Sequence, residues 1–256
     1  PRLLLNSRSR LFPEGLANRS GLIGKNLMFH CYGVIAGALP GPVESHKGPI
    51  GVCVFSHEFY ETDRSRGFVR GYQLQVGRQS GPVTVALGGL GTGRVPWGRE
   101  HHRVFDRRFG HLAYIGVMGE DLPEEHNEVV LDPTLTDAHG IPAPLVRYRL
   151  SENSRAMLDH GVARATEVME AAGGTDILVA SPMHKSGWHL LGTCRMGDDP
   201  ARAVTDRWGR AHDVPNLFIV DGSLFVTSAV GNPTTTIQAL ALRTADYIRR
   251  ERANLG

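Results

Sequence analysis

The chain has 256 residues, 41% hydrophobic and 21% charged, which is the composition of an ordinary globular protein. Its 28 basic and 26 acidic residues give a formal net charge of +2, and the basic residues are scattered, which argues against a nucleic-acid partner. No apolar run reaches the roughly 20 residues that a membrane-spanning helix needs, and the sequence shows no signal peptide.

The first 30 residues have the glycine-punctuated pattern of a loop, and short apolar runs follow up to about residue 131. Residues 68–76 alternate, which predicts a half-buried strand with Gln73 and Gln75 on a solvent-facing side. Further strands are expected at 83–87 and 129–131, and turns at 80–82, 88–89 and 132–133. Strands with one wet side favour an antiparallel sheet.

Residues 151–172 carry apolar side chains at helical spacing. Ser151 is the expected N-cap, and Gly173-Gly174 is expected to end the helix. The predicted architecture of this part is α+β, an antiparallel sheet covered by helices on one face.

The last 70 residues change character. The apolar run 217–220 predicts a strand buried on both faces, and Asp221-Gly222 ends it. A helix is then expected from Pro233 to about Arg250, with Asn232 as its N-cap. Strand, turn and helix in this order indicate an α/β unit.

Two segments could carry chemistry. The Asn232–Thr236 segment would place free N–H groups and three hydroxyls at a helix N-terminus, which attracts anions, although the same residues could merely begin a helix. His189 precedes a glycine-flanked turn and could accept a proton near neutral pH, although it could equally be structural. The cysteines Cys31, Cys53 and Cys194 form no CxxC pair and are expected to be free thiols.

No metal site is expected. There is no HExxH motif, and the adjacent His101 and His102 would point in different directions on a strand.

Several stretches together resemble one family. "HLLGTCRMG", "NLFIVDGS" and "GNPTTTIQALALRTADYI" resemble the C-terminal signature of the glucose–methanol–choline (GMC) oxidoreductases. "PRLLLNS", "GLANRSGLIGKNLMFH" and "EDLPEEHNEVVLDPTLTDAHGIPAPLVRY" resemble earlier segments of that family, in the same order. The resemblance covers nearly the whole chain.

The resemblance implies an α+β substrate domain plus the C-terminal part of an α/β, Rossmann-like FAD-binding domain. Residues 1–30 would leave the FAD domain, 31–188 would form the substrate domain, and 189–256 would return to the FAD domain. The family's N-terminal GxGxxG unit is missing from this sequence. The chain is therefore expected to be a truncated portion of a longer protein that binds FAD weakly or not at all by itself.

The resemblance also implies a reaction, the FAD-dependent oxidation of an alcohol such as a sugar, sugar acid or polyol. His189 would be the catalytic base, and Asn232 would hydrogen-bond the substrate oxygen. Asp221, Gly222, Asn232, Pro233, Thr234 and Thr235 would lie against the cofactor. The electron acceptor would be oxygen, a quinone or a cytochrome.

Two alternatives stay open at this point. Some relatives bind FAD yet cleave cyanohydrins, so the protein could be a hydroxynitrile lyase. The chain could also be a truncated, non-catalytic fragment. Asn232 itself could either cap the helix or face the substrate, but not both with the same atoms.

Overall fold

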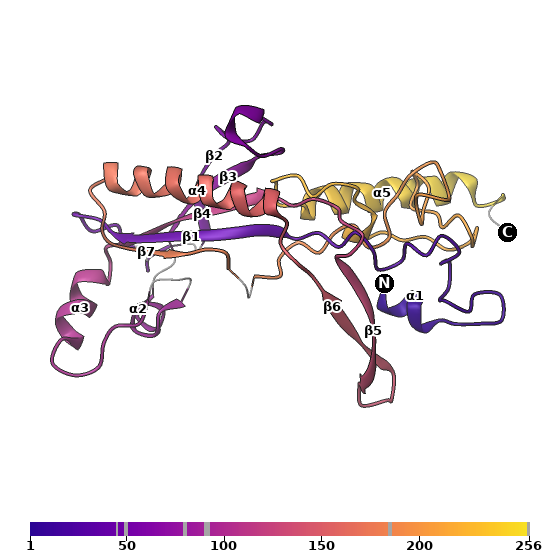
Figure 1. Cartoon of the computed structure of the whole chain (residues 1–256), viewed down its shortest axis with the longest axis horizontal. Coiled ribbons are helices and arrows are strands. Elements are labelled where there is room, and N and C mark those ends of the chain that lie inside the picture. The colour runs from indigo at the N-terminus through magenta and orange to yellow at the C-terminus, as the bar shows by residue number, and fades with distance from the viewer. Residues whose placement is uncertain (45, 49–50, 79–80, 90–92, 184–185, 255–256) are drawn as a thin grey trace. The chain divides into compact units, whose positions relative to one another are not determined.

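The computed structural model describes residues 1–44, 46–48, 51–78, 81–89, 93–183 and 186–254. The chain forms two compact units. The first unit comprises residues 1–30, 121–149 and 187–256, and the second comprises residues 31–120 and 150–186. The second unit is built around a sheet, and the first consists mainly of irregular segments, a hairpin and one long helix (Figure 1).

The sheet of the second unit has five strands in the order β2-β3-β4-β1-β7. Their bounds are β1 His30–Ala38, β2 Gly51–Ser56, β3 Tyr72–Arg78, β4 Leu112–Glu120 and β7 Thr175–Ala180. The pairs β2–β3, β3–β4 and β1–β7 are antiparallel, which agrees with the antiparallel sheet expected from the sequence.

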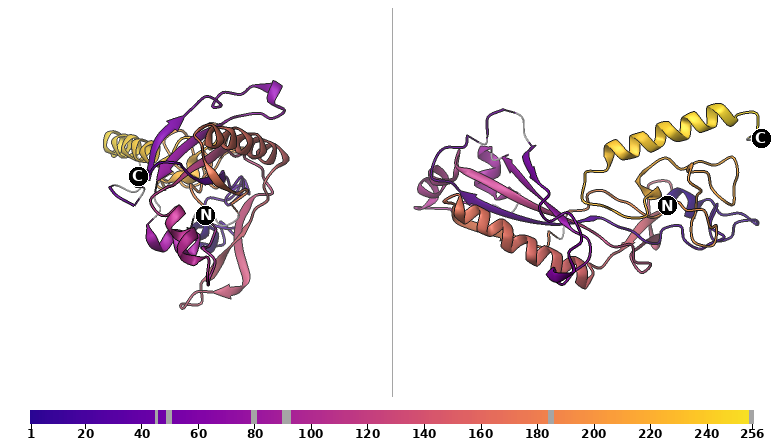
Figure 2. Two further views of the ribbon diagram at one scale, coloured as in Figure 1. Left: turned by 90° about the vertical axis from the view of Figure 1, so that its left-hand side faces the viewer. Right: turned by 90° about the horizontal axis from the view of Figure 1, so that it is seen from above.

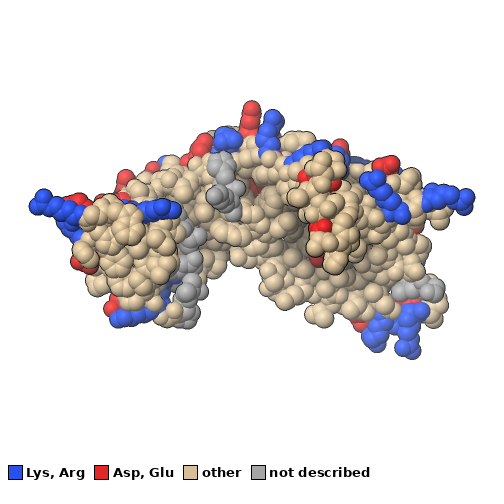
Figure 3. Space-filling view, turned by 90° about the horizontal axis from the view of Figure 1, so that it is seen from below, with Lys and Arg blue, Asp and Glu red and all other residues tan. Residues whose placement is uncertain are grey.

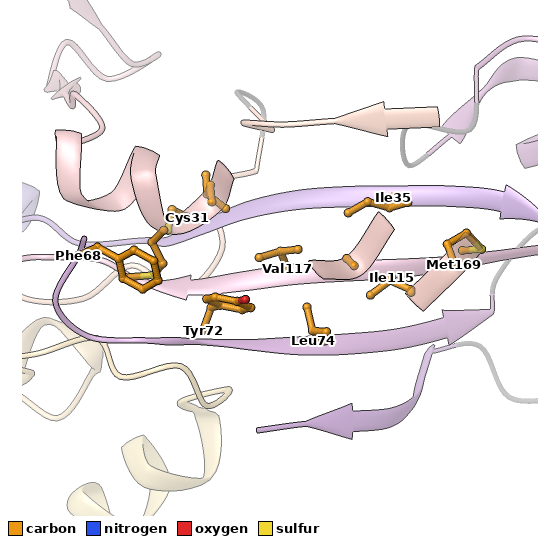
Figure 4. Close-up of a cluster of buried hydrophobic side chains, with 11 residues drawn as sticks. Cys31, Ile35, Phe68, Tyr72, Leu74, Ile115, Val117 and Met169 are labelled. Atoms are coloured by element: carbon orange, nitrogen blue, oxygen red, sulfur yellow. The ribbon is translucent and has the colours of Figure 1, made fainter. Parts of the chain in front are cut away.

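One face of this sheet is covered by α4 (Glu152–Ala171), which packs against β3, β4 and β7 (Figures 1 and 2). Ser151 caps the helix by accepting a hydrogen bond from the Ser154 N–H, and Gly173 follows its end with φ +77°. Both helix signals expected from the sequence are therefore confirmed. The buried side chains between helix and sheet form the main apolar core of the unit, drawn in Figure 4: Cys31, Ile35, Phe68, Tyr72, Leu74, Ile115, Val117, Met157, Leu158, Ala165 and Met169.

The prediction that one side of β3 faces solvent is wrong. Gln73 and Gln75 are only 2% and 4% exposed. The Tyr32 hydroxyl donates to the carboxamide oxygen of Gln75 (3.2 Å). The Nε2 atom of His57 lies 3.0 Å from the carboxamide oxygen of Gln73. The sequence pattern cannot distinguish this face from a solvated one, because the side chains that satisfy the amides come from distant positions.

Two tyrosines cover that second face by lying over glycines of neighbouring strands. A Cβ atom added to Gly116 would lie 2.0 Å from the Tyr32 hydroxyl oxygen, and one added to Gly77 would lie 2.2 Å from that of Tyr114. Burial raises the pKa of Tyr32, so its hydroxyl remains protonated and available as a donor. The sheet is therefore packed on both faces.

Two local predictions in this unit need correction. The expected strand at 83–87 is the helix α2 (Pro82–Leu87), because Pro82 occupies the first turn and Gly88 ends the helix with φ +77°. His101 and His102 begin the helix α3 (His101–Arg108), so they do not lie on a strand. A single turn of 3-10 helix, η1 (Arg64–Arg66), precedes β3. The expected turn at 80–82 includes Ser80, which lies outside the described residues.

The first unit contains the short helix α1 (Arg2–Asn6) and the antiparallel hairpin of β5 (Glu128–Thr136) and β6 (Pro142–Arg147). The turn expected at Asp132-Pro133 is wrong, since both residues lie within β5. The side chains of Lys25 and Arg147 both bind the Glu128 carboxylate. Burial raises the pKa of Glu128, but these two cationic donors outweigh burial, so the net pKa is lowered.

The C-terminal third of the first unit is mostly irregular up to α5 (Thr234–Glu251), which lies beside it in Figure 2. The expected strand at 217–220 forms only one isolated bridge, between Phe218 and Arg210. Two further backbone hydrogen bonds, from the Ala211 N–H to the Leu217 carbonyl (2.9 Å) and from the Ile219 N–H to the Gly209 carbonyl (2.8 Å), do not extend this bridge into a ladder, so the run is not a strand. The 3-10 helix η3 (Gly222–Leu224) follows it.

The division of the chain into two compact units differs from the expected domain boundaries at residues 121–149. Residues 121–149 cluster with the two ends of the chain, although the sequence placed them in the middle of the substrate domain. The assignment of the units to a substrate domain and an FAD domain stays a prediction. Cys31 and Cys194 are buried, and neither belongs to a disulfide.

Charged side chains are interspersed on the face drawn in Figure 3. Ion pairs such as Arg207–Asp198 (2.8 Å) and Arg249–Asp246 (2.9 Å) join neighbours on the surface. Among the described residues, no helix combines the length and apolar character needed to cross a bilayer.

The core between α4 and the sheet predicts a matched pair of mutants. Met157→Ala removes a side chain with 0% exposure and should lower the free energy of unfolding by about 2–5 kcal/mol, as large-to-small core substitutions do. Val168→Ala, on the same helix but 48% exposed, should change it by less than about 0.5 kcal/mol. Urea denaturation of both variants measures the difference, and equal losses would contradict this packing.

Candidate active site

His189 stands at the start of a segment that is held by backbone hydrogen bonds on two sides. Leu191 and Met28 exchange two bonds of 3.0 Å, and Cys194 N–H donates to the Ser223 carbonyl (2.8 Å). His189 itself adopts φ 62°, in the left-handed region, where histidine is enriched relative to most residues but which still costs energy. The backbone around His189 is thus fixed in a conformation that a freely moving loop would avoid.

Gly222 lies where three parts of the site meet. A Cβ atom added to it would lie 2.8 Å from the Leu190 carbonyl oxygen, 2.9 Å from Leu191 Cδ2 and 3.3 Å from Ile237 Cδ1. The 189–191 segment and the first turns of α5 therefore both approach this glycine closely. Asp221, its neighbour, uses Oδ1 to accept hydrogen bonds from the N–H (2.8 Å) and the hydroxyl of Ser223.

The helix α5 begins at Thr234, one residue later than expected. Its N-cap position is occupied by Pro233, one residue after the expected Asn232, and Pro233 makes no capping hydrogen bond with its side chain. The first turn contains no acidic residue and presents the hydroxyls of Thr234, Thr235 and Thr236. This is a set of donors without a competing carboxylate, and such a set fits an anionic oxygen of a bound group.

His30 joins His189 to the loop that leads to Asn232. Its Nδ1 lies 2.6 Å from His189 Nδ1, and the two rings meet edge to face with centroids 4.7 Å apart. Its Nε2 lies 2.8 Å from the Ala229 carbonyl oxygen and 3.2 Å from that of Ser228. Ala229, three positions before Asn232, is also left-handed, with φ 53°.

Both imidazoles are poised to be neutral near pH 7. His30 is 1% exposed; burial, and then the neighbouring His189, lower its pKa to about 4 against the smaller opposing effect of the two carbonyls. Burial also lowers the pKa of His189. A neutral imidazole can accept a proton, so His189 can act as a base at physiological pH.

The sequence therefore identified some residues of this site and missed another. The structure brings together His189, Gly222 and the first turn of α5 through the contacts around Leu190, Leu191 and Ile237. It was His30 that sequence reasoning missed, because a single histidine at the end of a loop gives no signal of its role. Among the described residues, no cluster of three or more His, Cys, Asp or Glu side chains could hold a metal ion.

Comparison with known proteins identifies the family of the chain. Residues 123–241 match the family model "GMC oxidoreductase". The chain is 46% identical to the 2-methyl-1,2-propanediol dehydrogenase of Mycolicibacterium austroafricanum over 98% of its length and 46% of that protein. It is 32% identical to the fructose dehydrogenase large subunit of Gluconobacter japonicus, over 97% of this chain and 45% of that one. A solved formate oxidase has the same fold, with a TM-score of 0.62 at 14% identity, over 94% of this chain and 49% of that one.

The chain belongs to the GMC oxidoreductase family, whose members are FAD flavoproteins. It spans about half the length of the curated relatives that it matches. Those two relatives are named dehydrogenases.

The contact at Gly222 predicts a second pair of mutants. Gly222→Ala would push a methyl group against the Leu190 carbonyl, and because backbone cannot yield as a flexible side chain does, it should cost about 1–3 kcal/mol of stability. Gly231→Ala adds the same methyl group in the same region, where nothing lies within 4 Å, and should be nearly neutral. Thermal unfolding of the two variants tests this, and a neutral Gly222→Ala would refute the close approach.

The neutral state of His30 predicts a pH-dependent stability. Its folded pKa of about 4 lies below its ordinary value of 6.5, so the unfolded chain binds more protons between these two values. The contribution of His30 is therefore fully present above pH 6.5 and is lost progressively as the pH falls toward 4, by at most about 1.4 kcal/mol per pH unit. Urea denaturation at several pH values measures this dependence. Between pH 4 and 6.5 the free energy of unfolding should rise less steeply with pH for His30→Asn than for the wild type.

Proposed function

We propose that the protein containing this chain oxidises an alcohol, with FAD as the redox cofactor and His189 as the catalytic base. The observation that carries this proposal is the position of the His189 imidazole, which is held against His30 where Gly222 and α5 converge, and burial lowers its pKa. The membership of the chain in the GMC family supports it.

Oxidation of an alcohol to a carbonyl removes a proton from oxygen and a hydride from carbon. FAD supplies the acceptor for the hydride when it is bound. His189 would take the hydroxyl proton as the carbonyl forms, which is the ordinary task of a general base. Asn232 would donate a hydrogen bond to the same substrate oxygen and hold it in place.

The cofactor would lie against the start of α5. Thr234 and Thr235 would donate to an anionic part of it, supported by the positive end of the helix dipole. Asp221, Gly222, Asn232 and Pro233 would line the same side, with Gly222 keeping the backbone of the His189 segment close. The first turn of α5 fits the group because it offers donors and no acidic side chain, and Oδ1 of the nearby Asp221 accepts from the N–H and hydroxyl of Ser223.

The substrate is proposed to be an alcohol that carries further hydroxyl groups, a polyol, sugar or sugar acid. The two curated relatives described above are named for a propanediol and for fructose, which share this chemistry. Dioxygen, a quinone or a cytochrome would reoxidise the cofactor.

Anaerobic mixing of the FAD-loaded protein with candidate polyols and sugars tests the proposal. Bleaching of the oxidised flavin absorbance by one of them, without oxygen, is the expected result. A protein whose bound FAD is reduced by no alcohol across diols, sugars and sugar acids would overturn it.

The base role of His189 generates a sharper prediction. His189→Ala should lower the limiting rate of flavin reduction by roughly 10²- to 10⁴-fold, the usual contribution of a general base, while leaving the FAD content nearly unchanged. His126→Ala, a histidine of the same unit whose side chain is 52% exposed, is the matched control and should change neither quantity. Stopped-flow absorbance and the ratio of flavin to protein absorbance measure the two effects. An equal loss of both in His189→Ala would make His189 a structural residue.

A further inference from the structure

The hydrogen bonds of His30 determine which of its ring nitrogens carries the proton. Its Nε2 faces two backbone carbonyl oxygens, of Ala229 at 2.8 Å and of Ser228 at 3.2 Å. A carbonyl oxygen can only accept a hydrogen bond, so Nε2 of His30 must be the protonated donor. In a neutral imidazole the other nitrogen, Nδ1, is then an acceptor.

The protonated nitrogen of His30 also determines which nitrogen of His189 carries the proton. Its Nδ1 lies 2.6 Å from His30 Nδ1, which can only accept in this state. His189 must therefore carry its hydrogen on Nδ1 and its lone pair on Nε2. Two main-chain carbonyls thus select the tautomer of a side chain that they do not touch.

We propose that His30 is a positioning residue, which fixes the tautomer and orientation of His189 so that the Nε2 lone pair of His189 faces the substrate hydroxyl. This inference rests on the proposed function for its catalytic consequence, but not for the tautomer itself. His30 does not touch the substrate, and it acts through His189.

The carbonyls that hold His30 are themselves fixed. The Ser228 hydroxyl accepts a hydrogen bond from the Asp121 N–H (2.8 Å) and donates to the Asp121 carbonyl (3.1 Å). The Asp121 carboxylate accepts from the Tyr148 hydroxyl (2.7 Å) and from the N–H of Phe29 (3.3 Å), the residue before His30. One buried aspartate therefore anchors both the carbonyl loop and the backbone next to His30, and His30 spans the space between that loop and His189.

The proton that His189 would accept stays on His189. Protonation at Nε2 leaves the Nδ1–H of His189 donating to His30, so the hydrogen bond between the rings persists and becomes charge-assisted. Burial of His30 opposes a second step in which this proton would move to His30. The arrangement is a holder for the base and not a relay away from it.

Ring ¹⁵N NMR of the FAD-loaded protein, labelled at histidine, tests the tautomer directly. His189 is assigned by the signal that disappears in His189→Ala. Near pH 7.5 the wild-type His189 should show a protonated Nδ1 and an unprotonated Nε2, and the opposite tautomer would overturn the proposal. This measurement needs no variant of His30 and no substrate.

Two variants separate the bonds of His30. In His30→Asn the carboxamide oxygen stands near the place of Nδ1 and can still accept from His189. In His30→Gln the amide nitrogen stands near the place of Nε2, so it keeps a donor to the Ala229 carbonyl and loses the acceptor. His30→Gln should lower the limiting rate of flavin reduction by roughly 10- to 100-fold, as loss of an orienting partner does, with little change in the apparent substrate Kd. His30→Asn should retain most of the rate.

The outcomes separate this inference from the proposed function. Equal rates in wild type, His30→Asn and His30→Gln, with unchanged ring signals of His189, would overturn the positioning role while leaving alcohol oxidation intact. A protein that no alcohol reduces would overturn the function, yet the wild-type ring signals would still decide the tautomer. If both variants fail to fold, the wild-type spectrum decides it in the same way.

Discussion

A single buried imidazole organises the candidate active site. His30 has no access to solvent, so each of its two nitrogens must find a partner within the protein. One nitrogen meets the carbonyls of residues 228 and 229, and the other meets His189. Because a neutral imidazole has one donor and one acceptor, satisfying the first partner dictates the second. With a histidine at position 30, the direction of both hydrogen bonds is thereby determined by main-chain carbonyls.

Strain is located at both ends of this contact. His189 and Ala229 adopt the left-handed conformation, which costs of order 1–3 kcal/mol at a residue other than glycine. Such conformations persist only where the surroundings compensate for them. Here the compensation comes from the hydrogen bonds to His30 and from the backbone pairing of Leu191 with Met28 and of Cys194 with Ser223. The same bonds that orient the base also hold the two loops that present it.

What the sequence could predict follows from which interactions are local. Ser151 and Gly173 act within one turn of α4, so the ends of that helix could be predicted. The expected strand at 83–87 failed because the β-branched Val83, Thr84 and Val85 favour a strand, whereas Pro82 and Gly88 favour a short helix. Gln73 and Gln75 are buried because of Tyr32 and His57, which are remote in sequence. His189 and the start of α5 were found through a family signature, but the role of His30 needed a contact across 159 positions.

The tyrosines that lie over Gly77 and Gly116 make these positions sterically dependent on each other. A side chain at 116 and a phenol ring at 32 would compete for the same volume, as would a side chain at 77 and the ring at 114. Replacing the glycine alone would force an overlap with the tyrosine, and shortening the tyrosine alone would leave a void over the glycine. In related sequences a larger residue at the glycine position should be accompanied by a smaller one in place of the tyrosine, so that exchanges at these two pairs of sites occur together during evolution.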